Sequence, residues 1–484
     1  MNEEGVTFVQ QTKPNILWIC TDQQRFDTIH SLGNPDIRTP HIDRLVAQGV
    51  AFTKAYVQSP ICSPSRASFL TGRYPRTTRV TKNGAPYFPE DEVLVTKILA
   101  ESGYDCGLVG KLHLSSNRNE QMPFGIERRY DDGYRYYRWS PTPRNGWEVG
   151  HDYQVWLKEQ GIEWEKHYKR RDGGIEAKYS QTSWCTYETE RFIRYNSHAP
   201  WLLSVNLFDP HEPFDPPMEY KQRYLPSDMP LPKWKDGELA NKPEIQQSDY
   251  INGGQGGLGP ACAKLSDIEK QEYVADYYAM IEQIDDHVGK LLTVLEETGQ
   301  LENTVIIFMS DHGEMLGDHG LIWKGAYFYE GLVHVPLIIS WPGHIQQNMK
   351  SDALVELVDL APTLLDLCGV EIPYYMQGKS LLSILTGKTN PHQHKDHVYC
   401  EFYHALLNTH EDIYATMYYD GRYKIVVYQG IDLGELYDHQ TDPDEFVNLW
   451  DLPEMFQKKY ELMKKCFDAS ISTVDPKPPL LYFS

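Results

Sequence analysis

Five short apolar runs constrain the fold of this chain more than any other feature. They lack the alternation of polar and apolar residues, which is typical of strands in a parallel sheet covered on both faces. Helical patterns lie between them; in the clearest, at residues 265–298, apolar residues recur every three or four positions and Gly299 supplies a stop. We therefore predict an α/β fold, with a large mixed, mainly parallel sheet flanked by helices on both faces. The predicted strands are residues 15–20, 104–109, 201–207, 304–309 and 335–340.

The sequence pattern of predicted strands alternating with helices changes after about residue 388. Two strand-like segments at residues 414–419 and 423–428 are followed by a helical pattern at 453–469. We predict a smaller C-terminal subdomain, residues 389–484, with an antiparallel sheet and a closing helix. It would follow a catalytic domain at residues 1–388, and a length of 484 residues suits one large domain plus a smaller one.

The composition excludes some functions. The formal net charge of −22 argues against nucleic-acid binding, although a local cationic pocket can still bind an anionic substrate. No run of about 18 apolar residues predicts a membrane span. The polar N-terminus has no apolar signal core, so we expect a cytoplasmic protein as written, or a periplasmic or secreted one if a leader was removed. The eight cysteines are scattered, and all except Cys62 are expected to be buried thiols.

Polar side chains follow four of the predicted strands. Ligands of open α/β sheets bind at the carboxyl ends of strands, so we expect these side chains to form one shared site. They are Asp22 and Gln23 after the first strand, Lys111 and His113 after the second, His211 after the third, and Asp311 and His312 after the fourth.

The stretch at residues 59–73 is the most informative motif. Its Cys62-Ser63-Pro64-Ser65-Arg66, followed by Thr71-Gly72-Arg73, resembles the signature of the type I sulfatases, in the alkaline-phosphatase-like superfamily. In that family a dedicated enzyme converts the cysteine of Cys-x-Pro-x-Arg to formylglycine. The resemblance continues along nearly the whole chain, through Gly110-Lys111-Leu112-His113, Pro210-His211-Glu212-Pro213-Phe214, Ser310-Asp311-His312-Gly313, Lys324 and Leu436-Tyr437-Asp438.

The resemblance implies a divalent metal site. Its ligands would be Asp22, Gln23, Asp311 and His312, with the converted Cys62 completing the set. Ligation rich in oxygen favours a hard cation such as Ca²⁺. The family often has Asp at the position of Gln23 and Asn at that of His312, so Mn²⁺ and Mg²⁺ remain alternatives.

The chemistry of sulfate ester cleavage suggests roles for the other residues. The reaction needs a nucleophile, neutralised sulfate oxygens and a proton for the leaving oxygen. A hydrated aldehyde has two hydroxyls on one carbon: one attacks sulfur, and the other then expels the sulfate. We expect Arg66 and Lys111 to hold the converted residue and the developing charge. His113 would be the base, and His211 and Lys324 would contact the bridging oxygen.

These assignments predict a sulfatase that hydrolyses sulfate monoesters and depends on a sulfatase-maturing enzyme. Residues 124–153 are rich in arginine and aromatic residues, so we hypothesise a sulfated carbohydrate substrate contacted by Arg135 and Arg138, although these side chains could equally pack the insertion onto the domain.

Two other functions and one loop assignment complete the expectations. A phosphonate or phosphate ester hydrolase of the same superfamily is the first alternative, and Lys111 and His113 favour the sulfatase. A non-catalytic protein that binds sulfated glycans is the second, and it predicts the loss of catalytic residues. We also expect a surface loop at residues 230–259, with a flexible turn at 253–257.

Overall fold

The fold is that of a computed structural model, which describes residues 13–116, 126–143, 151–168, 173–196, 199–406 and 413–476. Its main sheet has eight strands in the order β10-β2-β9-β7-β1-β6-β4-β5. Only the pairs β2–β9 and β7–β9 are antiparallel, so the predicted mixed, mainly parallel sheet is confirmed. The strands are β1 (Asn15–Thr21), β2 (Gly49–Phe52), β4 (Asp105–Gly110), β5 (Tyr136–Trp139), β6 (Trp201–Asn206), β7 (Thr304–Ser310), β9 (Leu337–Ser340) and β10 (Met349–Ser351).

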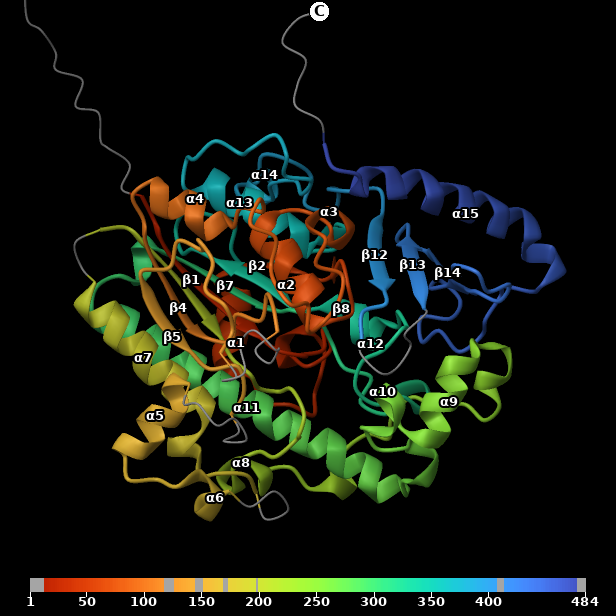
Figure 1. Cartoon of the computed structure of the whole chain (residues 1–484), viewed down its shortest axis with the longest axis horizontal. Helices are drawn as coiled ribbons and strands as arrows, with labels where there is room; N and C mark the ends of the chain where they lie inside the picture. Colours follow the sequence, from red (N-terminus) through yellow and green to blue (C-terminus); the bar gives the residue numbers. More distant parts are fainter. Residues whose placement is uncertain are drawn as a thin grey trace, which may run out of the picture.

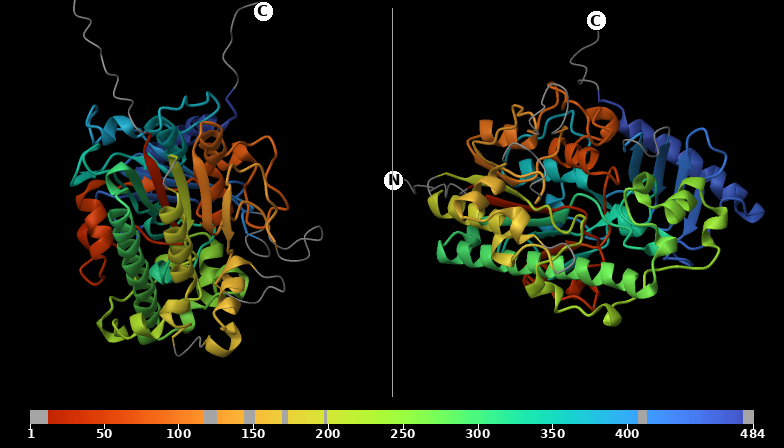
Figure 2. Two further views of the ribbon diagram at one scale, coloured as in Figure 1. Left: turned by 90° about the vertical axis from the view of Figure 1, so that its left-hand side faces the viewer. Right: turned by 60° about the horizontal axis from the view of Figure 1, so that its bottom comes forward.

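The central strands are buried on both faces because helices cover each side (Figures 1 and 2). In β1, Ile16 and Trp18 face one hydrophobic cluster, whereas Leu17 and Ile19 face another. This alternation explains the unbroken apolar runs. The first face packs against α2 (Cys62–Thr71), α4 (Val95–Glu101) and α13 (Leu360–Leu367), and the second against α1 (Pro40–Ala47), α7 (Gln181–Tyr195) and α11 (Asp267–Glu297).

The long helix α11 confirms the prediction at residues 265–298. It begins after Ser266, which forms a capping box with Glu269. Among the described residues, none of the helices combines the length and the apolar character that crossing a lipid bilayer requires.

The predicted strand at 335–340 is wrong as a single strand. Pro336 separates β8 (His334–Val335) from β9, because proline has no N–H to donate to a continuous ladder. The short β8 instead joins β3 (Ala55–Tyr56) and β11 (Val355–Glu356) in a separate three-stranded sheet.

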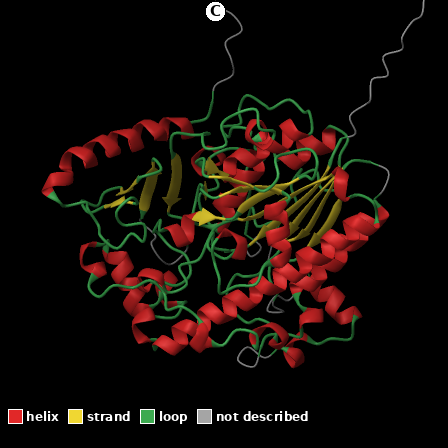
Figure 3. Cartoon of the chain, turned by 180° about the vertical axis from the view of Figure 1, so that it is seen from behind, coloured by secondary structure: helices red, strands yellow, loops and turns green. Residues whose placement is uncertain are grey.

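The C-terminal part forms the predicted antiparallel sheet and helix (Figure 3). Side chains of β12, β13 and β14, such as Phe402 and Met417, belong to the same hydrophobic cluster as Trp18 in the main sheet. The division at residues 388 and 389 stays a prediction. The elements are β12 (Val398–Tyr403), β13 (Tyr414–Tyr419), β14 (Tyr423–Tyr428), β15 (Glu435–Asp438) and α15 (Phe456–Ser470).

The predicted loop at 230–259 is partly wrong, because it contains the helices α9 (Glu244–Asn252) and α10 (Gly254–Gly257). Polar contacts hold α9 in place: the amide of Gln246 donates to Glu435 at 2.8 Å and accepts from the hydroxyl of Tyr329 at 2.8 Å. A helix that is buried through polar side chains lacks the apolar period from which helices are predicted.

Candidate active site

The site lies where the carboxyl ends of four parallel strands meet the first turn of α2. Asp22 follows β1, Lys111 follows β4, and Asp311 follows β7. Cys62 is the first residue of α2, and His211 comes five residues after the end of β6. The predicted convergence of strand ends therefore occurs around the N-terminus of α2, whose dipole favours negative charge.

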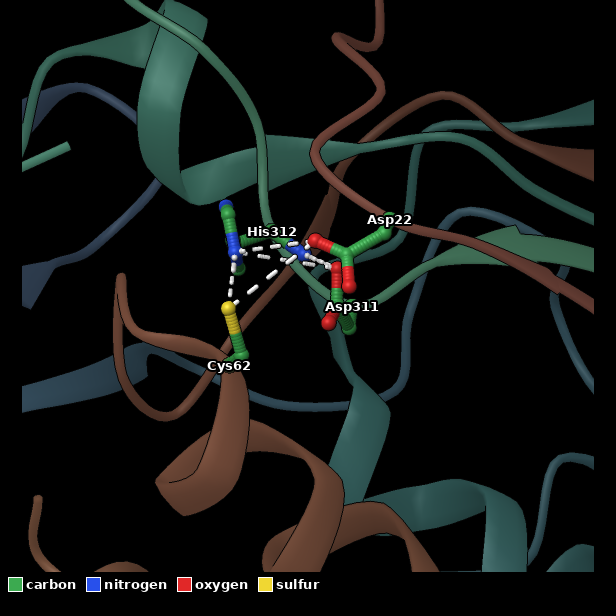
Figure 4. A group of neighbouring side chains, drawn as sticks. All are labelled: Asp22, Cys62, Asp311 and His312. Carbon is green, nitrogen blue, oxygen red and sulfur yellow. Dashed lines mark hydrogen bonds and ion pairs between the residues drawn. The ribbon is translucent and has the colours of Figure 1, made fainter. Parts of the chain in front are cut away.

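Four side chains of the predicted metal site point toward one another (Figure 4). Ligand atoms of Asp22, Cys62, Asp311 and His312 all lie within 4.8 Å of one another, and all four residues are buried. Nε2 of His312 lies 3.0 Å from the sulfur of Cys62, 3.7 Å from Oδ1 of Asp22 and 3.8 Å from Oδ1 of Asp311. Two carboxylates and one imidazole suit a divalent cation, so the donor set fits a metal.

Gln23 is adjacent to this group and is held in one orientation. Its amide nitrogen donates to Oε2 of Glu212 at 2.6 Å and also to Glu314. Its carbonyl oxygen accepts from Lys324 at 2.6 Å. Because both amide hydrogens are used by carboxylates, the carbonyl oxygen points toward Lys324, which also contacts the sulfur of Cys62; Gln23 as the fifth ligand stays a prediction.

Sequence reasoning missed the two carboxylates that orient Gln23. Glu314 also accepts the backbone N–H groups of Leu316 and Trp323, so it joins Gln23 to the loop that leads to Lys324. Burial and the neighbouring Glu212 raise the pKa of Glu314 to about 7. The only feature of the sequence that pointed to Glu314 was its position two residues after His312.

Cationic side chains pair with the buried carboxylates. Arg66 is fully buried; its Nε donates to Asp311 at 2.8 Å and its Nη2 to Asp22 at 3.1 Å. Nζ of Lys111 donates to the same Oδ2 of Asp22 at 2.5 Å. Burial alone would raise the pKa of Asp22, but the nearby cations, Lys111 foremost, lower it below its ordinary value.

Cys62 lies in a strongly cationic environment. Burial raises the pKa of its thiol, but the charges of Lys324, Lys111 and His312 outweigh burial and hold the pKa well below its ordinary value. A hydrogen bond with His113 lowers it further. An anionic or strongly polarised group is therefore stabilised at position 62.

Lys324 joins the remaining predicted residues to the site. Its Nζ lies 3.2 Å from the sulfur of Cys62 and 2.9 Å from Nε2 of His211. Nδ1 of His211 lies 2.8 Å from the carbonyl oxygen of Glu212, which leaves Nε2 facing the site. Burial and the charge of Lys111 lower the pKa of His113, which favours a neutral imidazole able to accept a proton.

The structure does not bring Arg135 and Arg138 to this site. Arg135 pairs with Asp105 at the first residue of β4, whereas the site lies beyond the last. Arg138 pairs with Glu188 of α7 at 3.4 Å, on the sheet face opposite to α2. Within the predicted insertion, residues 124–125 and 144–150 lie outside the described residues.

Comparisons with known proteins agree with this geometry. The family described as Sulfatase matches residues 14–370, and the C-terminal family of N-sulphoglucosamine sulphohydrolase matches residues 317–471. An arylsulfatase of Clostridium perfringens is 29% identical over 94% of this chain and 93% of its own length. An N-acetylglucosamine-6-O-sulfatase of Bacteroides thetaiotaomicron is 28% identical over 94% and 86%.

Solved structures show the same fold. The phosphonate monoester hydrolase of Agrobacterium radiobacter has a TM-score of 0.82 and 25% identity, and the match covers 96% of each chain. Because the first family spans well over half of the sequence, the chain belongs to the sulfatase family of the alkaline phosphatase superfamily and is a hydrolase of that family.

Proposed function

We propose that this hydrolase cleaves sulfate monoesters, with a formylglycine made from Cys62 and a divalent ion held by Asp22, Gln23, Asp311 and His312. The observation that carries the proposal is the convergence of these side chains around the sulfur of Cys62. The hydrated aldehyde would supply one hydroxyl to attack sulfur and a second to release the sulfate. Carboxylate and amide oxygens favour Ca²⁺, while the imidazole of His312 keeps Mn²⁺ and Mg²⁺ as alternatives.

Other residues of the chain would stabilise the developing charge and transfer protons. Arg66 and Lys111, both paired with Asp22, would balance negative charge as it develops at position 62. His113, with its lowered pKa, would accept the proton of the second hydroxyl. Lys324 and His211, whose side-chain nitrogens lie 2.9 Å apart, would contact the bridging oxygen and protonate the leaving alcohol.

For the substrate we propose a sulfated carbohydrate. The supporting observation is similarity to an N-acetylglucosamine-6-O-sulfatase and to an ulvan-active sulfatase of Formosa agariphila, which is 29% identical over 78% of this chain. Since Arg135 is paired at the opposite end of β4 and Arg138 on the opposite face of the sheet, glycan contacts would come from other residues.

A phosphonate or phosphate ester hydrolase is the second candidate. It is favoured by the TM-score of 0.82 with phosphonate monoester hydrolases and by 28% identity to a multifunctional alkaline phosphatase superfamily protein of Trinickia caryophylli. Lys111 and His113 favour the sulfatase, because the resemblance gives this Lys and His as features of sulfatase sites, and here they contact Asp22 and Cys62. All six predicted catalytic side chains are present, which argues against a non-catalytic glycan-binding protein.

The test compares rates on one aryl sulfate and on the phosphodiester and phosphonate monoester with the same leaving group. We expect kcat/KM to be largest for the sulfate. The intact mass of the peptide that contains Cys62 must first show conversion of the thiol to an aldehyde, and Cys62→Ala serves as the inactive control. If the converted protein strongly preferred a phosphorus ester, the sulfatase proposal would be rejected in favour of a phosphonate or phosphate ester hydrolase.

A further inference from the structure

The C-terminal helix α15 carries apolar side chains in two directions. Leu462, Cys466 and Ala469 are buried against the C-terminal sheet and fix the helix to the molecule. A second row of apolar side chains points away from the sheet. Figures 1 and 2 show α15 along the outer edge of the molecule, so this second row faces outward.

We name the second row the outer stripe and define it by six residues. Their spacing of three or four positions places Phe456, Tyr460, Met463 and Phe467 on one side of α15, and Ile471 and Val474 lie at the start and the end of the short 3-10 turn that follows. Their exposed fractions range from 40% to 71%. Single exposed apolar residues are ordinary on a protein surface, whereas a row of them in contact with one another is not. The outer stripe consists of Phe456, Tyr460, Met463, Phe467, Ile471 and Val474.

The outer stripe is large enough for a protein interface. Phe456, Tyr460 and Phe467 are 53%, 69% and 71% exposed. Because an aromatic side chain buries about 150–250 Å², covering the whole stripe would bury roughly 600 Å² per chain, or roughly 1,200 Å² for two copies. That area reaches the lower bound of specific interfaces, about 1,200 Å² in total.

The pattern is complementary to itself when two copies of the helix run in opposite directions. If a two-fold axis passes between residues 463 and 464, Phe456 of one copy lies beside Ile471 of the other. Tyr460 then lies beside Phe467, and Met463 meets its own counterpart near the axis. Each large side chain therefore meets an apolar partner, as a closed two-fold interface requires.

The charges next to the stripe favour a protein partner over an anionic lipid surface. Lys464 pairs with Asp468 at 2.5 Å, and Glu461 pairs with Lys458 at 2.8 Å and with Lys465 at 3.0 Å. Three of the four lysines of α15 are thus paired with carboxylates of the helix, and the fourth, Lys459, lies over the rings of Trp450 and Phe456. The whole chain carries −22, which repels anionic headgroups.

From the stripe, its area and its two-fold pattern, we propose that the outer stripe of α15 is the interface of a homodimer in which the two helices pack antiparallel. The dimer contact lies on the outer side of α15, apart from the candidate active site.

The first test measures mass in solution by light scattering after gel filtration, over a range of concentrations. The full-length protein should appear at twice the chain mass of 56.0 kDa. The double variant Tyr460→Glu/Phe467→Glu should weaken dimerisation by at least about 100-fold, because central aromatic residues dominate interface energetics. Tyr195→Glu, which changes an aromatic side chain 84% exposed on α7, is the matched control and should leave the dimer intact.

The second test fixes the direction of the helices. Met463→Cys should give a disulfide-linked dimer under mild oxidation, and the eight native cysteines, all buried, should not. Phe456→Cys should not cross-link, because antiparallel packing separates its two copies by about 22 Å along the helix. Both variants keep Leu462, Cys466 and Ala469, the inward contacts of α15, so the fold should persist.

Several outcomes would overturn the proposal. They are a monomer at every concentration, a dimer unaffected by the double variant, and cross-linking through residue 456 but not 463. Removal of residues 477–484 should leave the dimer intact. Loss of the dimer in the truncated protein would assign the interface to residues 477–484 instead of the outer stripe.

Discussion

Arg66 shows how single residues organise the site. Its fully buried guanidinium donates to Asp311, to Asp22 and, at 3.0 Å, to the carbonyl oxygen of Lys111. One side chain thereby ties the ends of β1, β4 and β7 to α2. The fork geometry of arginine permits these three contacts at once, which the single ammonium of lysine cannot reproduce.

His312 offers a test of the proposed metal site. His312→Ala removes one donor without leaving a buried charge, so we expect the affinity for a divalent ion to fall by at least about tenfold. Equilibrium dialysis followed by elemental analysis measures this loss. His439→Ala is the control: it belongs to a similar group with Glu330 and Glu445, where Nζ of Lys424 already lies 2.7 Å and 2.6 Å from the two carboxylates. Equal losses in both variants would contradict the proposed ligand set.

Lys324 allows a test of the proposed leaving-group role. We expect Lys324→Ala to lower kcat/KM for a nitrophenyl sulfate by about 100-fold and to lower it further for an alkyl sulfate, whose leaving oxygen needs a proton more. Rates on a series of esters measure the dependence on leaving-group pKa. Lys233→Ala, which removes a lysine paired with Asp444, is the control. A loss independent of the leaving group would show that Lys324 does not act at the bridging oxygen.

At the residue scale, the site residues that belong to sequence motifs could be predicted. Cys62 and Arg66 share one motif, and Asp311 and His312 share another, so local spacing was sufficient. The roles of Glu212 and Glu314 depend on contacts with Gln23 across 189 and 291 residues of chain, which no local pattern encodes. Arg135 and Arg138 are paired with carboxylates away from Cys62, and composition does not tell which end or face of a strand a side chain occupies.

At the element scale, Gly110 is the last residue of β4 and lies beside Asn206 of β6. A Cβ at Gly110 would lie 1.9 Å from the carbonyl oxygen of Asn206, whereas a Cβ at Gly103 would meet nothing within 4 Å. Both glycines have positive φ, at 100° and 92°. Gly110→Ala should therefore lower the free energy of unfolding by at least about 3 kcal/mol, and Gly103→Ala by only about 1 kcal/mol. Urea denaturation compares them; similar losses would mean that conformation alone, and not the close contact, requires the glycine.

The contact of α7 with α11 should make the protein sensitive to mild acid. Burial lowers the pKa of His287 to about 3, where its ring contacts Thr186 and Ser183 of α7. Between pH 6.5 and 3 the unfolded chain therefore binds more protons at this residue than the fold does. Stability is fully present above pH 6.5 and falls as the pH is lowered, by about 1–2 kcal/mol between pH 6.5 and 5.

The variant His287→Gln isolates this effect. It should lose less stability than the native protein between pH 6.5 and 5, as measured by urea denaturation at the two pH values. An unchanged pH dependence would assign the acid sensitivity to other residues.

Strands and the long helix could be predicted because their apolar residues repeat locally. Pro336 was a visible signal that the run at 335–340 is interrupted, and the rule that proline breaks a ladder would have found it. The helix α9 had no comparable signal, because Gln246 is buried by pairing with Glu435 rather than by apolar packing.

At the scale of the whole molecule, a buried ionic group joins the C-terminal sheet to α12 (Glu330–Val333), which precedes it in the chain. Lys424 of β14 is fully buried and pairs with Glu330 of α12 and with Glu445. The hydrophobic cluster of the main sheet also continues into the C-terminal sheet. We therefore expect the described parts of the chain to unfold together rather than in two steps.

Lys424→Met tests this connection. It leaves two carboxylates buried without their cation, so the free energy of unfolding should fall by about 3–5 kcal/mol. Arg422→Met removes a half-exposed arginine paired with Asp438 and should cost less than about 1 kcal/mol. Scanning calorimetry should show one transition in both variants; a new early transition in Lys424→Met would show that the C-terminal sheet unfolds by itself.

The burial of Cys62 determines when, relative to folding, this residue could be modified. The residue is 1% exposed, and every other position of α2 is buried around it. A modifying enzyme must contact the side chain of residue 62, and this burial prevents such contact in the folded chain. The proposed conversion of Cys62 would therefore have to take place before α2 packs into the core, and a chain that folded first would keep its thiol.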